Sequence, residues 1–121
     1  MKVKFLTLVG SIAVAFPAFA HEIARGPHGG RVADGGAYHV ELVAKDSTVE
    51  VFLTGAGDKA VPATGFKGTA ILVVNGKPQR IVLEASGDAK LTGKADVTLP
   101  AQPKGAIQLT APDGKTASAK F

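Results

Sequence analysis

Three histidines and Glu41, all within residues 21–41, have side chains that can bind a transition metal. His21, His28 and His39 are the only histidines in the 121 residues, and residues 40–121 contain none. Imidazole nitrogens and carboxylate oxygens are ligands for divalent transition metals such as Cu(II) and Zn(II). The grouping therefore predicts a metal site formed by the three histidines, with Glu41 either as a further ligand or as the acceptor that orients a ring.

The rest of the composition limits which metal such a site would hold. The chain has no cysteine, and its only methionine is Met1. Beyond that residue there is neither a thiolate nor a thioether, the soft ligands that select Cu(I). Imidazole, carboxylate and amine groups suit Cu(II), Zn(II), Ni(II) and Co(II) alike. We expect copper or zinc as the bound ion.

Residues 1–20 have the organisation of a secretory signal peptide. Two lysines precede an uncharged apolar run at residues 5–16, a proline ends the run, and Ala18–Ala20 (AFA) gives the small-x-small cleavage pattern. The run is shorter than the about 20 residues that a membrane-spanning helix needs, which favours cleavage over an uncleaved anchor. We therefore expect a periplasmic chain that begins at His21 and is not held in the membrane.

Cleavage after Ala20 would give His21 a second nitrogen ligand. Its new α-amine and its own Nδ1 can chelate one ion, and further imidazoles would complete a nitrogen-rich, roughly planar set of the kind that Cu(II) prefers. The amine must lose a proton to bind, so affinity should rise with pH. The alternative is that a histidine stands at the cleavage site by chance.

The pattern around His39 predicts the two faces of a strand. In AYHVELVA (37–44), alternation places Tyr38, Val40 and Leu42 on the core face and places His39 with Glu41 on the other. The alternative is that this second face is a solvated surface without a function. His28 lies in GPHGG (26–30), where it is either an exposed turn residue or is brought to a neighbouring strand as the two glycines fold the backbone back.

The body of the chain has the pattern of a small antiparallel β protein. We expect residues 21–36 to be a flexible, Gly-rich irregular segment and residues 37–121 to be an all-β domain, an Ig-like β-sandwich of six to seven strands, with a barrel as the alternative. No segment sustains a helical period, and Asn75-Gly76 and Asp113-Gly114 are hairpin signals. Turn sequences separate short strand-like segments at 37–44, 48–54, 69–75, 79–85, 95–99, 106–111 and 116–121.

Charge and motifs argue against several other functions. Lys and Arg number 14 against 10 Asp and Glu, and removal of Lys2 and Lys4 leaves 12 against 10. This balance is too weak for a nucleic-acid-binding face. The serines of the mature chain are not in a nucleophile elbow, and there is no cysteine nucleophile. We expect neither enzymatic activity nor a nucleic-acid partner, and the oligomeric state stays open.

The segment GPHGGRVADGGAYHVELV (26–43) resembles the His-Gly-Gly segment in soluble extensions of the periplasmic adaptor subunits, or membrane-fusion proteins, of heavy-metal efflux systems. The ending APDGKTASAKF (111–121) is similar to their terminal hairpin. The resemblance implies a small β domain concerned with divalent heavy metals, implies an efflux complex as partner, and carries over His28 and Glu41. The sequence contains neither the coiled-coil hairpin nor the lipoyl-like module of full adaptors.

A second resemblance rests on His21 alone. Its position after AFA is similar to that of the mature amino-terminal histidine of periplasmic copper-resistance carriers, small β-sandwiches in which this residue is a Cu(II) ligand. We therefore expect a periplasmic copper or zinc carrier or buffer linked to metal resistance. The rival hypothesis is a non-catalytic envelope interaction or structural domain with incidental histidines.

Overall fold

The structure, a computed structural model, describes residues 24–121 and confirms the all-β class. In this part of the chain the only helical turn is the 3-10 turn η1 (Ala56–Asp58), and no helix is long and apolar enough to span a membrane. The strands are β1 (Ala24–Arg25), β2 (Arg31–Gly35), β3 (Tyr38–Lys45), β4 (Thr48–Thr54), β5 (Lys67–Val74), β6 (Lys77–Ser86), β7 (Lys90–Lys94), β8 (Lys104–Thr110) and β9 (Thr116–Lys120).

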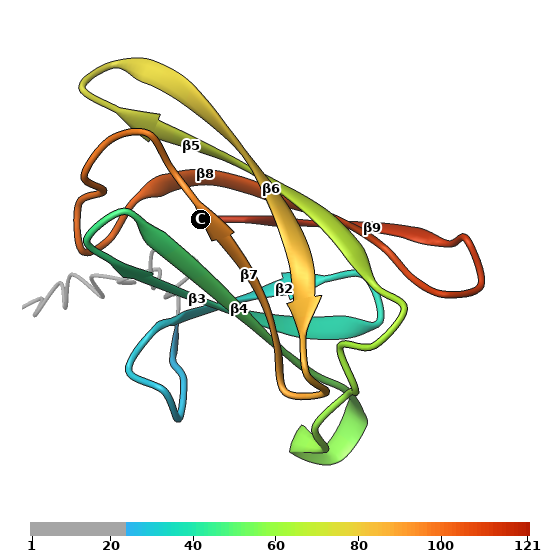
Figure 1. The fold of residues 1–121 in the computed structure, drawn as a ribbon. Coiled ribbons are helices and arrows are strands. Elements are labelled where there is room, and N and C mark those ends of the chain that lie inside the picture. The colour runs from blue at the N-terminus through green and yellow to red at the C-terminus, as the bar shows by residue number, and fades with distance from the viewer. Residues whose placement is uncertain (1–23) are drawn as a thin grey trace, which may run out of the picture.

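Hydrogen bonds join all nine strands into one antiparallel sheet, in the order β1-β2-β3-β4-β7-β6-β5-β8-β9. The sheet curls so strongly that β2 and β9, near its two ends, lie against each other (Figure 1). The approach is close: a Cβ placed on Gly35 of β2 would lie 3.3 Å from the Cβ of Ala119 on β9. The hydrogen bonding thus gives one curled sheet, not the two separate sheets of a sandwich.

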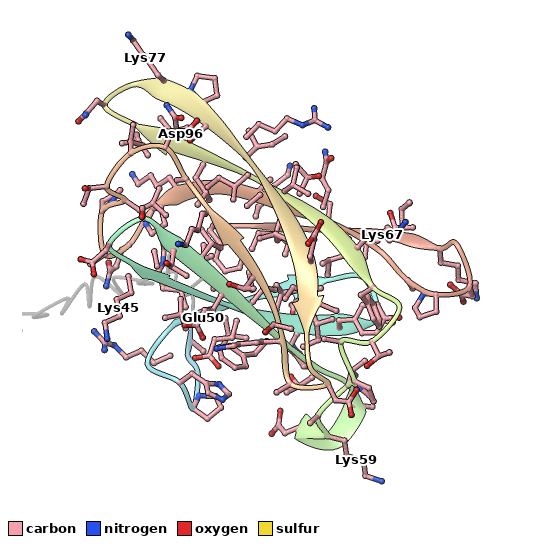
Figure 2. The ribbon with its side chains drawn as sticks, viewed as in Figure 1. Lys45, Glu50, Lys59, Lys67, Lys77 and Asp96 are labelled. Carbon is pink, nitrogen blue, oxygen red and sulfur yellow. The ribbon has the colours of Figure 1, made fainter. Side chains whose placement is uncertain are left out.

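The core fills the inside of the curl. Strand β4 alternates as expected, with Val49, Val51 and Leu53 buried and the residues between them facing outward. Burial of each such side chain contributes about 1.5 to 3 kcal/mol. Charged side chains project from the outside, as Lys59 and Lys77 do at opposite ends of the molecule (Figure 2).

Both predicted hairpin turns are present. Asn75 and Gly76 have φ of 51° and 75°, as a two-residue turn with both central residues in the left-handed region requires. They join β5 to β6, with Val74 paired to Lys77. The turn at Asp113-Gly114 joins β8 to β9 and includes a hydrogen bond from the Gly114 N–H to the Ala111 carbonyl of 2.9 Å.

Three parts of the strand prediction are wrong. The segment 21–36 is not irregular where it is described, because residues 24–25 and 31–35 form β1 and β2. Residues 95–99 are not a strand: the Ala95 and Leu99 N–H groups instead donate to carbonyls of the turn at residues 46–47. The strand β7 lies just before them, and its sequence KLTGK gives no alternating pattern because it has one apolar residue, the fully buried Leu91.

Candidate metal-binding site

The turn between β1 and β2 positions His28. It is closed by hydrogen bonds from the Gly26 N–H to the Gly30 carbonyl, 2.9 Å, and from the Gly29 N–H to the Gly26 carbonyl, 3.1 Å. Gly29 has a φ of +79°, in the left-handed region that glycine adopts more readily than residues with a side chain. The prediction that the glycines fold the backbone back and bring the ring to a neighbouring strand is confirmed, because His28 contacts both β3 and β4.

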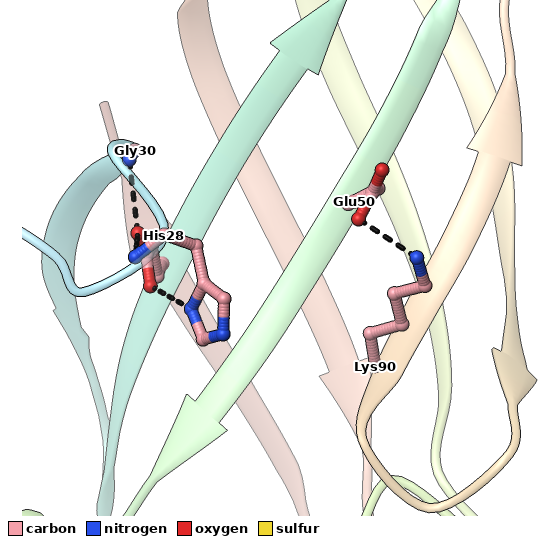
Figure 3. A network of polar contacts seen from close by, with 5 residues as sticks. His28, Gly30, Glu50 and Lys90 are labelled. Carbon is pink, nitrogen blue, oxygen red and sulfur yellow. Dashed lines mark hydrogen bonds and ion pairs between the residues drawn. The ribbon is translucent and has the colours of Figure 1, made fainter.

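Glu41 of β3 lies beneath this turn, only 4% exposed. One of its oxygens, Oε2, accepts hydrogen bonds from the backbone N–H groups of His28 and Gly30, each of 2.9 Å. The other, Oε1, is 2.7 Å from Nδ1 of the His28 ring. Figure 3 shows these contacts converging from His28 and Gly30. Three donors therefore satisfy a carboxylate that burial would otherwise make costly.

The alternative of a solvated strand face is wrong for Glu41, which is buried. The residue does point to the same side of β3 as His39, as alternation requires. The turn of residues 26–30 covers it, and the cover is tight, because a Cβ on Gly26 would overlap the Glu41 carboxylate. The predicted core face of this strand is confirmed, because Val40 and Leu42 are buried and Tyr38 is partly buried.

The His28 ring is held on a second side by Phe52. The two rings stack with centroids 3.6 Å apart and planes within 7° of each other. Phe52 is the partner of Glu41 across the β3–β4 ladder, so the two side chains leave the same face of the sheet. The ring of His28 is thus oriented by a hydrogen bond at Nδ1 and a stacking contact, while 47% of the side chain stays exposed.

The carboxylate partner also assigns the tautomer of His28. A carboxylate only accepts, so Nδ1 carries the hydrogen and the lone pair of the neutral ring is on Nε2. Among residues 24–121 no hydrogen bond engages that second nitrogen. Within the described part of the chain, the ring therefore has one nitrogen, Nε2, that is available to bind a metal.

His39 has a similar arrangement in a more open place. Its Nδ1 is 2.9 Å from Oδ1 of Asp34, its partner across the β2–β3 ladder. The side chain of His39 is 47% exposed and that of Asp34 is 87% exposed. Both described histidines thus have Nδ1 on a carboxylate oxygen and Nε2 free of hydrogen bonds within residues 24–121.

The structure brings together only part of the predicted ligand set. His28 and Glu41 are in contact, and His39 lies two residues from Glu41 on the same strand face. His21 lies outside the described residues. Within residues 24–121, no group of three or more histidine, aspartate or glutamate side chains is close enough to hold a metal.

Two residues of the site were missed by sequence reasoning. Phe52 occupies an outward position of β4, and a large aromatic residue there is a signal that something covers it. Asp34 lies in DGG (34–36), which indicates a turn, and only the ladder register shows that it faces His39. The nearby ion pair between Lys90 Nζ and Glu50 Oε2, 2.9 Å (Figure 3), joins β7 to β4 and does not contact His28.

Comparison of the chain with protein-family models, with curated proteins and with solved structures gives no match.

Proposed function

We propose that this protein binds a divalent transition metal, copper or zinc, in the periplasm and acts as a carrier or buffer linked to metal resistance or efflux. One observation carries the proposal: the Nδ1 atoms of His28 and His39 lie 2.7 Å and 2.9 Å from carboxylate oxygens. Metal-ligating histidines almost always donate their other ring N–H to such an acceptor, which fixes the ring and raises its basicity.

In this proposal His28 and His39 bind the ion through Nε2, and Glu41 orients the His28 ring without binding metal itself. Both oxygens of Glu41 already accept hydrogen bonds, three in all, and the carboxylate is 4% exposed. A direct bond to metal would require breaking those contacts in a buried place. Glu41 therefore fits the orienting role better than the ligand role.

His21 is proposed as the third ligand, on grounds of reach. The first residue of β1, Ala24, pairs with Val32, which in turn pairs with Glu41. His21 precedes Ala24 by three residues, at most about 10 Å of extended chain. Neighbouring strands are about 4.8 Å apart, so this length spans the two strand spacings to β3. If the leader is cut after Ala20, the α-amine would add a fourth nitrogen.

The exposure of the two described histidines suits exchange of the metal with a partner. Each side chain is 47% exposed. A metal bound there can be approached by an incoming ligand without unfolding of the sheet, which a carrier or buffer requires. A closed four-ligand site would instead serve the stability of the fold.

The decisive experiment is a calorimetric titration of the protein with Cu(II) and with Zn(II). We expect one equivalent to bind and the melting temperature to rise, because a site that combines ligands from separate parts of the chain binds the folded state more tightly than the unfolded one. His28→Ala and His39→Ala should each weaken binding, whereas Asp58→Ala, at an exposed acid in η1, should not. Unchanged affinity in both histidine variants would refute the metal site.

The rival is a structural or interaction domain, and a specific contact favours it. The stacking of His28 on Phe52 and its bond to Glu41 would also fasten the turn of residues 26–30 to the sheet without any metal. In that case His28→Ala should lower the melting temperature of the metal-free protein. Titration with either metal should then give no heat of binding for the parent protein or for any variant.

A further inference from the structure

Two arginines are paired across the β1–β2 ladder at the edge of the sheet. Arg25 is the direct partner of Arg31. Residues directly opposite on antiparallel strands share one face with their Cβ atoms about 5 Å apart, and like charges in that position repel. Within residues 24–121, neither guanidinium group forms an ion pair with a carboxylate. The pair is thus a concentration of positive charge that this part of the chain does not neutralise.

Both arginines line the same pocket, of about 430 Å³. Its walls include Gln102 from the loop before β8 and the backbone of Gly29 and Gly30. His28 and Pro27 line a different pocket, beside Phe52, so the turn of residues 26–30 separates the arginines from the proposed metal site. The arginine pocket is therefore a separate feature, and its chemistry does not depend on metal binding.

Arg31 is anchored where it can serve a ligand. Its Nη1 donates a hydrogen bond of 3.0 Å to the carbonyl of Pro103, a fully buried residue. A guanidinium has five N–H donors, so this bond fixes the group and leaves four donors for other acceptors. Arg25 makes no side-chain hydrogen bond within residues 24–121 and is exposed. The Arg31 guanidinium is therefore held in place, and the Arg25 guanidinium can move toward a bound anion.

We propose that this pocket binds a small oxyanion, with phosphate or carboxylate oxygens held between Arg25 and Arg31 and the Gln102 amide as a further donor. A guanidinium group binds two such oxygens through a pair of parallel hydrogen bonds. A monatomic ion has no second acceptor atom and cannot form such pairs with the two arginines. The bound charge would also remove the repulsion between the two arginines. Binding and stability are therefore coupled.

The test is thermal unfolding of the metal-free protein at low ionic strength, with inorganic phosphate or with sodium chloride at equal ionic strength. Phosphate should raise the melting temperature in a saturable way, and chloride should not. Arg25→Gln should raise the melting temperature without phosphate, because it relieves repulsion. It should also weaken phosphate binding about tenfold, as loss of a charge-assisted hydrogen bond implies. Arg80→Gln, at an exposed arginine on β6, is the matched control and should change neither quantity.

Several results would overturn the proposal. Equal effects of phosphate and chloride, or equal responses of Arg25→Gln and Arg80→Gln, would show only general screening. A phosphate response seen only after Glu22→Gln, at a residue outside the described part of the chain, would overturn anion binding by the natural protein, because a carboxylate of the chain itself would then occupy the arginines. A different outcome is that the protein sediments with phosphatidylglycerol vesicles in a way that requires Arg25, while showing no response to inorganic phosphate. That result would show that the arginines contact a membrane surface and do not form a site for a small anion. Acetate in place of phosphate identifies which oxyanion the pocket prefers.

Discussion

Glu41 and His28, 13 residues apart in the chain, meet where an oxygen of the buried carboxylate lies 2.7 Å from Nδ1 of the half-exposed His28 side chain. The same carboxylate accepts the backbone N–H groups of His28 and Gly30. The position of the imidazole therefore depends on the carboxylate in two ways, through the ring itself and through the backbone that carries it. Any function of His28 should be sensitive to Glu41.

We expect Glu41→Ala to destabilise the protein by about 2 to 5 kcal/mol, because it leaves one buried and one partly buried backbone N–H without an acceptor and opens a small cavity. Urea denaturation followed by circular dichroism measures this loss. His39→Ala is the control, since its contact with Asp34 is exposed and such pairs contribute at most about 1 kcal/mol. If both variants lose the same amount, Glu41 does not hold the turn.

Gly26→Ala should disrupt the same turn by a purely steric route. The new Cβ would overlap the Glu41 Cδ, closer than any real contact, so the turn or the carboxylate must move. We expect a loss of about 2 to 4 kcal/mol, seen as a fall of roughly 10 to 25 °C in melting temperature for a domain of this size.

Gly55→Ala is the control for the Gly26 prediction. It also adds one methyl group at a non-helical glycine, but there the new Cβ would meet only ordinary contacts, the nearest 3.4 Å away at Val61. Its melting temperature should stay within a few degrees of the parent. If Gly26→Ala has the same melting temperature as Gly55→Ala, the turn is not packed on Glu41 as described.

The strands were largely predictable because their pattern is local. The alternation at residues 48–54 follows from buried positions on β4, and Asn75-Gly76 adopts the turn that its backbone preferences favour. The curl of the sheet was not predictable, because it depends on Gly35 meeting Ala119 across most of the chain. Nothing in either segment by itself indicates that they meet.

The site was predictable in its residue types and less so in its roles. The glycines after His28 indicated a fold-back turn, and that turn is present. Alternation placed Glu41 on an outer face, but burial of that face depends on a turn 11 to 13 residues earlier in the chain, whose docking no local pattern encodes. The pairing of His39 with Asp34 likewise follows from the ladder register.

Phe52→Leu should loosen His28 without removing it. The substitution keeps an apolar side chain but removes the stacked ring, a contact that contributes about 0.5 to 1.5 kcal/mol for aromatic pairs. In NMR spectra the His28 ring protons should lose their ring-current shift, and metal affinity should fall less than in His28→Ala. Ring-proton shifts that are the same in the parent and the variant would contradict the stacked geometry.

One glycine added before His21 in the mature protein should weaken Cu(II) binding by about tenfold or more, because it moves the α-amine away from the imidazole with which it would chelate. Zn(II), which is satisfied by imidazoles in a tetrahedral site, should be affected less. Calorimetric titration of both forms measures the difference. Equal copper affinities would exclude the amine as a ligand and leave the imidazoles to be tested alone.

Glu41→Gln and Asp34→Asn form the sharpest pair of variants, because each removes the charge from a carboxylate that contacts the Nδ1 atom of a histidine. Loss of such an outer acceptor typically costs about 10- to 100-fold in metal affinity. We expect the larger loss for Glu41→Gln, since that carboxylate is 5% exposed at its side chain and fixes its ring, whereas Asp34 is 87% exposed and competes with water. Both variants should still bind one equivalent, because neither removes a ligand. A Glu41→Gln protein that loses all binding yet keeps its melting temperature would show instead that Glu41 coordinates the ion directly.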